Sequence, residues 1–210
     1  MLEHFQWLPF LAAITVLTMS PGVDTLLVLR SSAVSGWRVG VVCSLGICLG
    51  LFAHATISAL GLSVILLGSA TLFTAFKMAG AVYLAYLGVQ ALRSAMNPQG
   101  LNLKTTGVKP LTAATAFRQG ILSNVLNPKT IVFYMAFLPQ FIDPAHSAIG
   151  QSLFMAALHF IIAMVWQSLL AVMVHRARVW LARPKVAQVL DSITGILLVG
   201  FGIKLALTER

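Results

Sequence analysis

The chain has 210 residues, of which 59% are hydrophobic and only 9% are charged. A soluble domain carries about 25% charged residues, so this composition excludes an ordinary soluble protein and indicates one that faces lipid. The net charge of +9 does not indicate a nucleic-acid-binding protein, because the basic residues are scattered between apolar segments. Strict alternation of apolar and polar residues is absent, so spanning segments must be helices.

At roughly 20 residues per span, the length allows six membrane helices with short loops. We predict an all-α membrane protein with spans at Phe5–Leu29, Val39–Leu67, Ala70–Leu92, Ala116–Phe141, Ile149–His175 and Val186–Leu207. The first span follows Glu3 and no basic segment, so we expect it to be retained rather than cleaved as a signal peptide. Basic residues cluster in the three loops on one side: Arg30, Arg38, Arg93, Lys104, Lys109, Arg118, Arg176, Arg178, Arg183 and Lys185. These loops should be cytoplasmic, with both termini outside.

The first predicted span is unusually polar for a membrane helix. Its polar, proline and glycine residues are Thr15, Thr18, Ser20, Pro21, Gly22, Asp24 and Thr25. Pro21 and Gly22 should interrupt the helical hydrogen bonds and leave a kink or an unwound turn. Asp24 lies about 9 Å inside Arg30, at a depth where a carboxylate is within hydrocarbon.

The fourth predicted span contains Asn124-Val-Leu-Asn-Pro-Lys129. Counting from Arg118 at about 1.5 Å per residue places Lys129 roughly 16 Å deep, near the middle of the bilayer. A charge at this depth is costly and is by default a hypothesis of function. Asn127-Pro128 should break the helix and free backbone carbonyls, as in the discontinuous helices of transporters.

The two halves of the chain are similar to each other. Residues 1–96 and 116–210 each hold three predicted spans, and 97–115 forms a polar connector rich in glycine and proline. The break at Pro21 corresponds to the break at Pro128, and His54 and His159 follow these prolines at similar distances. Because three is an odd number of spans, such repeats must be inverted in the membrane. This architecture places a binding site at the midplane and favours alternating access.

Asp24 and Lys129 therefore occupy corresponding places, and two interpretations stay open. They form a salt bridge that joins the repeats, or Asp24 binds an ammonium group or a proton while Lys129 binds a carboxylate. His54 and His159 are either packing residues or carriers of the coupled proton. Tyr83, Tyr86, Trp166 and Gln167 are either cavity-lining or packing residues. The pattern predicts no metal site and no cofactor.

Glycines at Gly36, Gly40, Gly46, Gly50, Gly80 and Gly88 are typical of close helix contacts. They serve internal packing and a homodimer equally well, so the oligomeric state stays open. Cys43 and Cys48 share one span on different helix faces, which makes a disulfide or a metal pair unfavourable. We expect both to be packing residues.

The chain resembles the LysE/RhtB family of amino-acid exporters over nearly its whole length. The resemblance rests on Ser20-Pro-Gly-Val-Asp-Thr25, Gly80-Ala-Val-Tyr-Leu-Ala-Tyr-Leu-Gly88, Asn124-Val-Leu-Asn-Pro-Lys129 and Phe137-Leu-Pro-Gln-Phe-Ile142. It implies a six-helix protein of the bacterial inner membrane that exports amino acids such as homoserine, threonine or leucine, in exchange for protons. Val23 stands where the family motif commonly has a second proline, which predicts a milder break in the first span.

The expected function is proton-coupled export of neutral amino acids. The substrate carboxylate would meet Lys129 and the amides near Asn124 and Asn127, next to Pro128. Its ammonium group would meet Asp24 and the carbonyls around Pro21 and Gly22. The proton would be carried by Asp24, His54 or His159.

Three other classes of protein are alternatives to this expectation. The first is a channel, or an efflux transporter for another small solute or ion; water channels pair two Asn-Pro-Ala loops, whereas this chain has one Asn-Pro-Lys. The second is an intramembrane enzyme, but no Gly-x-Ser-x-Gly or His-Glu-x-x-His motif accompanies the two histidines. The third is a redox relay, which would need cysteines on two different spans.

Overall fold

The computed structural model describes residues 5–68, 70–98, 109–143 and 145–207, and every regular element in these ranges is helical. The elements in chain order are α1 (Trp7–Met19), α2 (Val23–Ser35), α3 (Trp37–Gly68), α4 (Ala70–Met96), α5 (Ala113–Val125), α6 (Pro128–Val132), the π-helix η1 (Phe133–Phe137), the 3₁₀-helix η2 (Leu138–Phe141), α7 (Ala148–Val172), α8 (Val174–Leu181) and α9 (Pro184–Leu207). The predicted all-α class is confirmed. The predicted connector falls largely on residues 99–108, which lie outside the described ranges.

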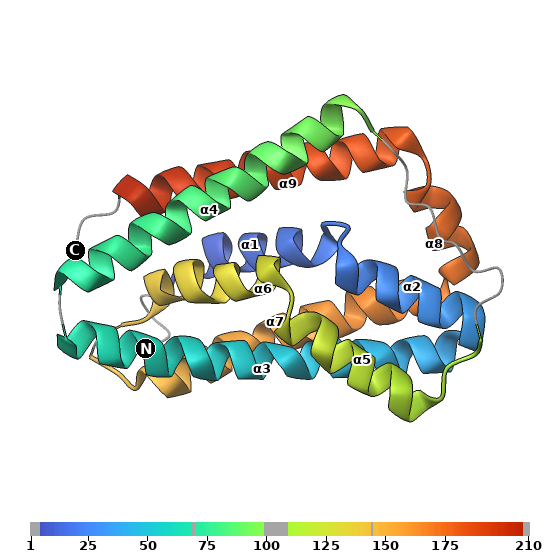
Figure 1. The fold of residues 1–210 in the computed structure, drawn as a ribbon, viewed down its shortest axis with the longest axis horizontal. Helices are drawn as coiled ribbons and strands as arrows, with labels where there is room; N and C mark the ends of the chain where they lie inside the picture. Colours follow the sequence, from blue (N-terminus) through green and yellow to red (C-terminus); the bar gives the residue numbers. More distant parts are fainter. Residues whose placement is uncertain (1–4, 69, 99–108, 144, 208–210) are drawn as a thin grey trace.

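Two of the predicted spans are broken helices. α1 and α2 meet at 50°, and α5 and the segment Pro128–Phe141 meet at 49°. Pro21 and Asn127-Pro128 stand in the two breaks, as predicted from the missing proline N–H. The two bend angles are nearly equal. The milder first break expected from Val23 stays a prediction, because it concerns a comparison with relatives that carry a second proline there. Figure 1 shows α1 and α6 side by side in the middle of the molecule.

Three of the predicted spans, and up to five if each bent pair is one span, have the length and apolar character to cross a bilayer. Three are single helices, Trp37–Gly61 within α3, Ala148–Val172 and Pro184–Leu207, and the two bent pairs bring the count to five. α4, the third predicted span, is not among them, and its sequence includes Lys77, Gln90 and Arg93. The apolar helices support a multi-pass membrane protein.

The boundary between the first two spans differs from the prediction. We expected the first span to end at Leu29, but α2 continues to Ser35. It ends where Gly36 adopts a positive φ of 87°, the left-handed conformation that glycine adopts without a steric penalty. A further helix, α8, occupies part of the segment after span five, where only a basic loop was expected. The α2–α3 turn, the C-terminal end of α4, the start of α5 and α8 all lie at one end of the bundle (Figure 1).

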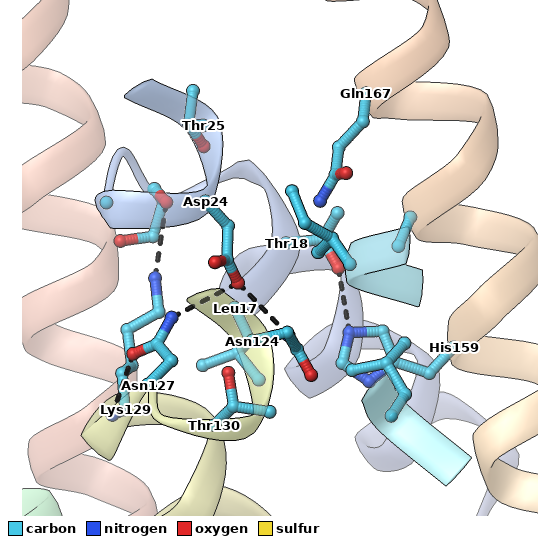
Figure 2. A pocket seen from close by; sticks show the side chains of 15 residues that line it. Leu17, Thr18, Asp24, Thr25, Asn124, Asn127, Lys129, Thr130, His159 and Gln167 are labelled. Carbon is cyan, nitrogen blue, oxygen red and sulfur yellow. Dashed lines mark hydrogen bonds between the residues drawn. The ribbon is translucent and has the colours of Figure 1, made fainter. Parts of the chain in front are cut away.

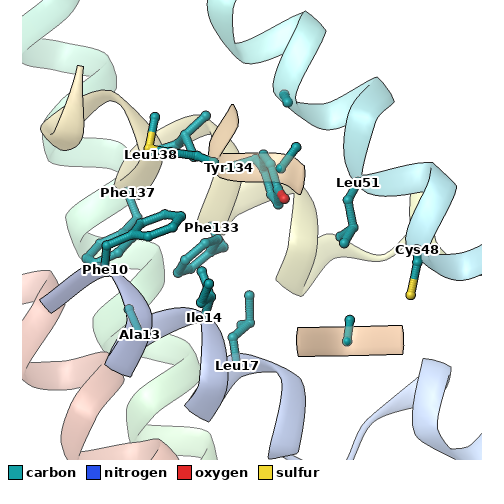
Figure 3. Close-up of a cluster of buried hydrophobic side chains, with 14 residues drawn as sticks. Phe10, Ala13, Ile14, Leu17, Cys48, Leu51, Phe133, Tyr134, Phe137 and Leu138 are labelled. Atoms are coloured by element: carbon teal, nitrogen blue, oxygen red, sulfur yellow. The ribbon is translucent and has the colours of Figure 1, made fainter. Parts of the chain in front are cut away.

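Corresponding helices of the two halves pack against each other. α3 packs on α7, and α4 packs on α9 in a pair along one side of the molecule (Figure 1). The main core forms where α1, α3 and η1 meet (Figure 3). Its largest buried side chains include Phe10 and Ile14 of α1 and Phe133, Tyr134 and Phe137 of η1. The core therefore lies directly beside the breaks and fixes their positions.

Glycines bring the backbones of neighbouring helices into contact, as the sequence predicts. A Cβ on Gly46 of α3 would lie 2.2 Å from the carbonyl oxygen of Phe117 on α5, and one on Gly120 would lie 2.3 Å from that of Cys43. A Cβ on Gly88 of α4 would lie 2.8 Å from the carbonyl oxygen of Gly195. These distances are shorter than any carbon–oxygen contact, so larger residues would force the helices apart.

Candidate functional site

The second break is capped by its own asparagine. The Asn127 side chain accepts a hydrogen bond from the backbone N–H of Lys129 at 3.0 Å, and Pro128 occupies the first turn of α6. Asparagine is a favoured N-cap residue, and proline is well tolerated at the first helical position because its missing N–H would be unpaired there anyway. The local sequence therefore ends α5 and restarts the helix so that Lys129 lies at its beginning.

Asp24, in the first turn of α2, is bound by side chains of the other broken span. Its carboxylate accepts hydrogen bonds from Ser123 Oγ at 2.6 Å, Asn124 Nδ2 at 3.0 Å and Asn127 Nδ2 at 3.2 Å. Hydrogen bonds to an ionised acceptor are stronger than neutral ones, and three of them offset much of the cost of burying a carboxylate. The second span thus provides the polar environment that the first span needs.

Lys129 makes the reciprocal connection. Its ammonium group donates to the carbonyl oxygen of Ser20 at 3.2 Å, in the first break. The Ser20 carbonyl oxygen is available because it lies in the gap between the end of α1 at Met19 and the start of α2 at Val23. Lys129 and Asp24 form no ion pair within 4.0 Å in the described part of the chain. Lys129 of the second broken span therefore binds a backbone carbonyl in the first break, and Asp24 of the first broken span binds neutral side chains at the second break.

A small cavity of about 40 Å³ lies between the two breaks (Figure 2). Its polar and backbone lining comes from Thr18, Ser20, Gly22, Asp24, Thr25, Asn124, Asn127, Lys129, Thr130, His159 and Gln167, and its apolar lining from Leu17, Ile47, Leu51 and Ala163. Figure 2 shows Asp24, Asn127 and Lys129 on one side of it and Thr18, His159 and Gln167 on the other. Because a buried water needs about 10–15 Å³, this cavity has room for about three waters, which is far less than an amino acid needs.

The sequence-predicted residues divide into two groups around this cavity. Asp24, Asn124, Asn127, Lys129, Gly22 and His159 line it, whereas Pro21, Pro128 and His54 do not. The two prolines act indirectly by breaking the helices. His54 donates from Nε2 to the carbonyl oxygen of Asn124 at 3.0 Å and so supports the end of α5. Of the four predicted cavity candidates, Gln167 lines the cavity and Tyr83, Tyr86 and Trp166 do not.

Two residues that hold the site together were not predicted as site residues, although one of them, Gly50, was expected to make a close helix contact. Ser123 makes the shortest bond to Asp24, and Gly50 faces Asn124 so closely that a Cβ there would lie 2.7 Å from Asn124 Oδ1. Ser123 could have been predicted, because it stands next to Asn124 and a buried carboxylate requires several hydrogen-bond donors. The contact of Gly50 depends on how α3 crosses α5, which a single sequence does not reveal.

The site contains no cluster of metal ligands. Nowhere in the described ranges do three or more His, Cys, Asp or Glu side chains gather in a way that could bind a metal ion. The polar lining combines one carboxylate and one ammonium group with hydroxyl and amide side chains and one imidazole. Its chemistry is suited to binding a small molecule that carries both a positive and a negative group.

Comparison with known proteins identifies the family. The LysE type translocator profile matches residues 15–209. The chain belongs to this family. LysE type translocators are transporters, so the protein is a membrane transporter and not an enzyme.

Similar proteins cover almost the whole translocator. An uncharacterized membrane protein of Bacillus subtilis is 35% identical over 96% of this chain and 98% of its own length. The homoserine/homoserine lactone efflux protein of Salmonella typhimurium is 31% identical, over 95% of each chain. The leucine efflux protein of Salmonella choleraesuis is 30% identical, over 94% of this chain and 92% of its own. No solved structure matches the chain.

Proposed function

We propose that this LysE type translocator exports neutral amino acids from the cytoplasm across the bacterial inner membrane, by alternating access coupled to the proton gradient. The proposal places six spans in two inverted repeats, residues 1–96 and 116–210, with the basic loops in the cytoplasm and both termini outside. Relatives named for homoserine and leucine efflux support this substrate class.

The observation that carries the proposal is the arrangement of the two charges. Asp24 and Lys129 face one cavity without forming an ion pair, and their present partners are neutral hydroxyl, amide and carbonyl groups. A zwitterionic amino acid offers a charged partner to each of them. The substrate ammonium would replace the amide donors on Asp24, and the substrate carboxylate would replace the Ser20 carbonyl on Lys129.

The neutral groups then have a defined role in the transport cycle. Asn124 and Asn127 bind Asp24 when the cavity is empty and become free to bind the substrate carboxylate when it is filled. The carbonyls next to Pro21 and Gly22 serve the ammonium group in the same way, and Pro128 keeps the second break open. Since the same amides join the two broken spans, exchange of partners would loosen one repeat from the other.

A proton has three places to bind in this scheme. Asp24 lies in the cavity, His159 lines it, and His54 contacts the backbone of Asn124. Protonation of Asp24 would weaken its hold on the amides just as the substrate ammonium does. Competition for one carboxylate is a simple way to exchange a proton for an amino acid.

Efflux from loaded liposomes tests the proposal. Purified protein is reconstituted with a panel of labelled amino acids, with and without an imposed proton gradient and an uncoupler. Saturable efflux that an uncoupler stops would support coupled export. Efflux that the uncoupler leaves unchanged, or that does not saturate, would favour a facilitator or a channel.

Lys129→Met tests the site within the same assay. The substitution keeps the length of the side chain and removes the charge, so we expect efflux to fall about 100-fold, as for loss of a charged hydrogen bond. Lys185→Ala is the matched control, because Lys185 is exposed at the start of α9 and away from the cavity. Wild-type efflux by Lys129→Met would rule out this site.

A further inference from the structure

A chain of three side chains leads from the cavity into the core. Thr18 Oγ1 lies 3.0 Å from His159 Nε2, and His159 Nδ1 lies 3.0 Å from the hydroxyl of Tyr134. All three are buried, with Tyr134 only 1% exposed. Tyr134 belongs to the π-helix η1, and its ring stacks on the His159 imidazole at an interplanar angle of 10°. Such π-helical turns frequently occur at functional sites.

The direction of these hydrogen bonds follows from their partners. Within the described residues, the Tyr134 hydroxyl has His159 Nδ1 as its one hydrogen-bond partner. A buried hydroxyl that donates to nothing is costly, so the phenol hydrogen must go to Nδ1. Neutral His159 then carries its own hydrogen on Nε2 and donates it to Thr18 Oγ1. Protonated His159 would donate from both nitrogens and leave the phenol hydrogen without an acceptor, so Asp24 and His54 are the favoured proton sites of the three proposed above.

The Thr18 hydroxyl consequently keeps its hydrogen for another acceptor. Hydroxyls within helices commonly donate to the carbonyl four residues earlier. Ser32, Ser44 and Thr56 of this chain do so, at 2.8 to 3.0 Å. Thr18 makes no such bond in the described structure and lines the cavity instead. Its hydroxyl hydrogen is therefore directed at whatever occupies the cavity.

We propose that Tyr134 is a positioning residue that fixes His159 as the Nε2–H tautomer, so that Thr18 donates a hydrogen bond to a side-chain oxygen of the transported amino acid. This inference rests on the proposed function and sharpens it. With the amino and carboxyl groups bound at Asp24 and Lys129, the substrate side chain would extend toward Thr18 and Gln167, on the other side of the cavity (Figure 2). A substrate with a hydroxyl there would be selected over an isostere with a methyl group.

The tautomer can be measured directly. Protein labelled with ¹⁵N at its histidines is compared with the His159→Gln variant to assign the His159 signals. In the wild type we expect a protonated Nε2 and an unprotonated Nδ1 that accepts a hydrogen bond. Tyr134→Phe should remove that bond and shift the Nδ1 signal, whereas Tyr83→Phe, outside the cavity, should not. A wild-type His159 protonated at Nδ1 would overturn the proposal.

Selectivity supplies the second test. Efflux of threonine is compared with that of valine, and homoserine with norvaline, because each pair differs by a hydroxyl in place of a methyl group. We expect the wild type to favour the hydroxyl member about tenfold in kcat/KM, the value of one hydrogen bond. Thr18→Val should bring this ratio toward one, Thr18→Ser should keep most of it, and Tyr134→Phe should lower it.

The outcomes separate this inference from the proposed function. Saturable efflux with equal rates within each pair, or a ratio that Thr18→Val leaves unchanged, would overturn the role of Thr18 and leave amino-acid export standing. Absence of any amino-acid efflux by the wild type would contradict the proposed function itself. If Tyr134→Phe fails to fold, the Thr18 pair still decides the question.

Discussion

Two pairs of helical segments in this protein meet through different kinds of surface. The broken spans meet through a carboxylate, an ammonium group, two asparagines and a serine. α4 and α9 meet through glycines, with Gly88 and Gly195 facing each other so closely that a Cβ on either would lie 2.8 Å from the other's carbonyl oxygen. Hydrogen bonds to a charge can be exchanged for equivalent ones, whereas backbone packing has no substitute. The first contact is suited to rearrangement and the second to staying intact.

Removal of one charge from the polar contact should have the largest effect. In Asp24→Asn, one oxygen can still accept from the amides of Asn124 and Asn127, but the negative charge that would bind the substrate ammonium is lost. We expect efflux to fall at least about 100-fold while the protein still reaches the membrane. The measurement is efflux from liposomes, with membrane amounts compared by immunoblot.

Asp191 on α9 offers the matched control for Asp24. It accepts a hydrogen bond from Ser94 Oγ of α4 at 2.7 Å, away from the cavity. Asp191→Asn keeps an oxygen for that hydroxyl, so efflux should stay within about twofold of the wild type. Equal losses in the two variants would mean that any carboxylate between helices behaves like Asp24.

An added methyl group in the glycine contact should destabilise the protein. A Cβ on Gly195 would lie 2.6 Å from Leu92 Cγ and 2.8 Å from the Gly88 carbonyl oxygen. We expect Gly195→Ala to lower the melting temperature of the detergent-solubilised protein by about 3–10 °C, as overpacking does. Gly200→Ala on the same helix has no atom within 4 Å and should change it little. An unchanged melting temperature for Gly195→Ala would contradict the rigid contact.

Gly50→Ala changes a glycine contact that supports the polar contact between the broken spans. The new methyl group would lie 2.7 Å from Asn124 Oδ1 and would displace the amide that binds Asp24. Loss of one such bond should lower efflux about tenfold. Gly61→Ala, also on α3, has open space around it and serves as the control. If the two variants export equally well, Asn124 does not need its observed position.

The smallest effect is expected at Asp143, which accepts hydrogen bonds as Asp24 does but in the exposed loop before α7. The backbone N–H of Ala145, at 2.9 Å, and then the His146 ring, at 3.0 Å, hold the pKa of the Asp143 carboxyl below its ordinary value of 3.8. A depressed pKa stabilises the folded state above about pH 4 and ceases to do so as the pH falls below it.

Asp143→Asn should therefore lower the melting temperature by less than about 1 °C at pH 7, because exposed charges contribute little. The difference from the wild type should diminish as the pH falls below 4. The measurement is a melting curve of each protein at both pH values. A fall in melting temperature at pH 7 as large as that of Gly195→Ala would mean that an exposed carboxylate contributes as much as a buried contact. Burial would then not explain why Asp24 is expected to matter more than Asp143.

The helical class, both breaks and the presence of buried polar partners around Asp24 and Lys129 were predictable from the sequence, because they depend on local chemistry. A proline removes an N–H wherever it stands, and a charge in an apolar run needs partners. The partners themselves were not predictable. The salt bridge between Asp24 and Lys129, one of the two interpretations, is not formed, because each is bound by the other break through neutral groups. Their binding of a substrate stays a prediction.

The residues that escaped prediction depend on tertiary packing. In the sequence, nothing distinguishes Tyr134 from the other aromatic residues of the same apolar run. Its position beside His159 arises from how η1 lies against α7. The length of α2 was also missed, because Arg30 suggested a loop while Gly36 is the residue that ends the helix. Charge patterns locate membrane boundaries better than they locate helix ends.

The size of the cavity has a consequence for a cell that carries many idle copies of this transporter. Spanning the roughly 30 Å of hydrocarbon in single file would take about ten water molecules, whereas the cavity of about 40 Å³ holds about three. This cavity alone is therefore too small to hold a file of water from side to side along which protons could hop. Idle copies therefore do not drain the gradient that feeds other pumps through a water-filled passage at this cavity.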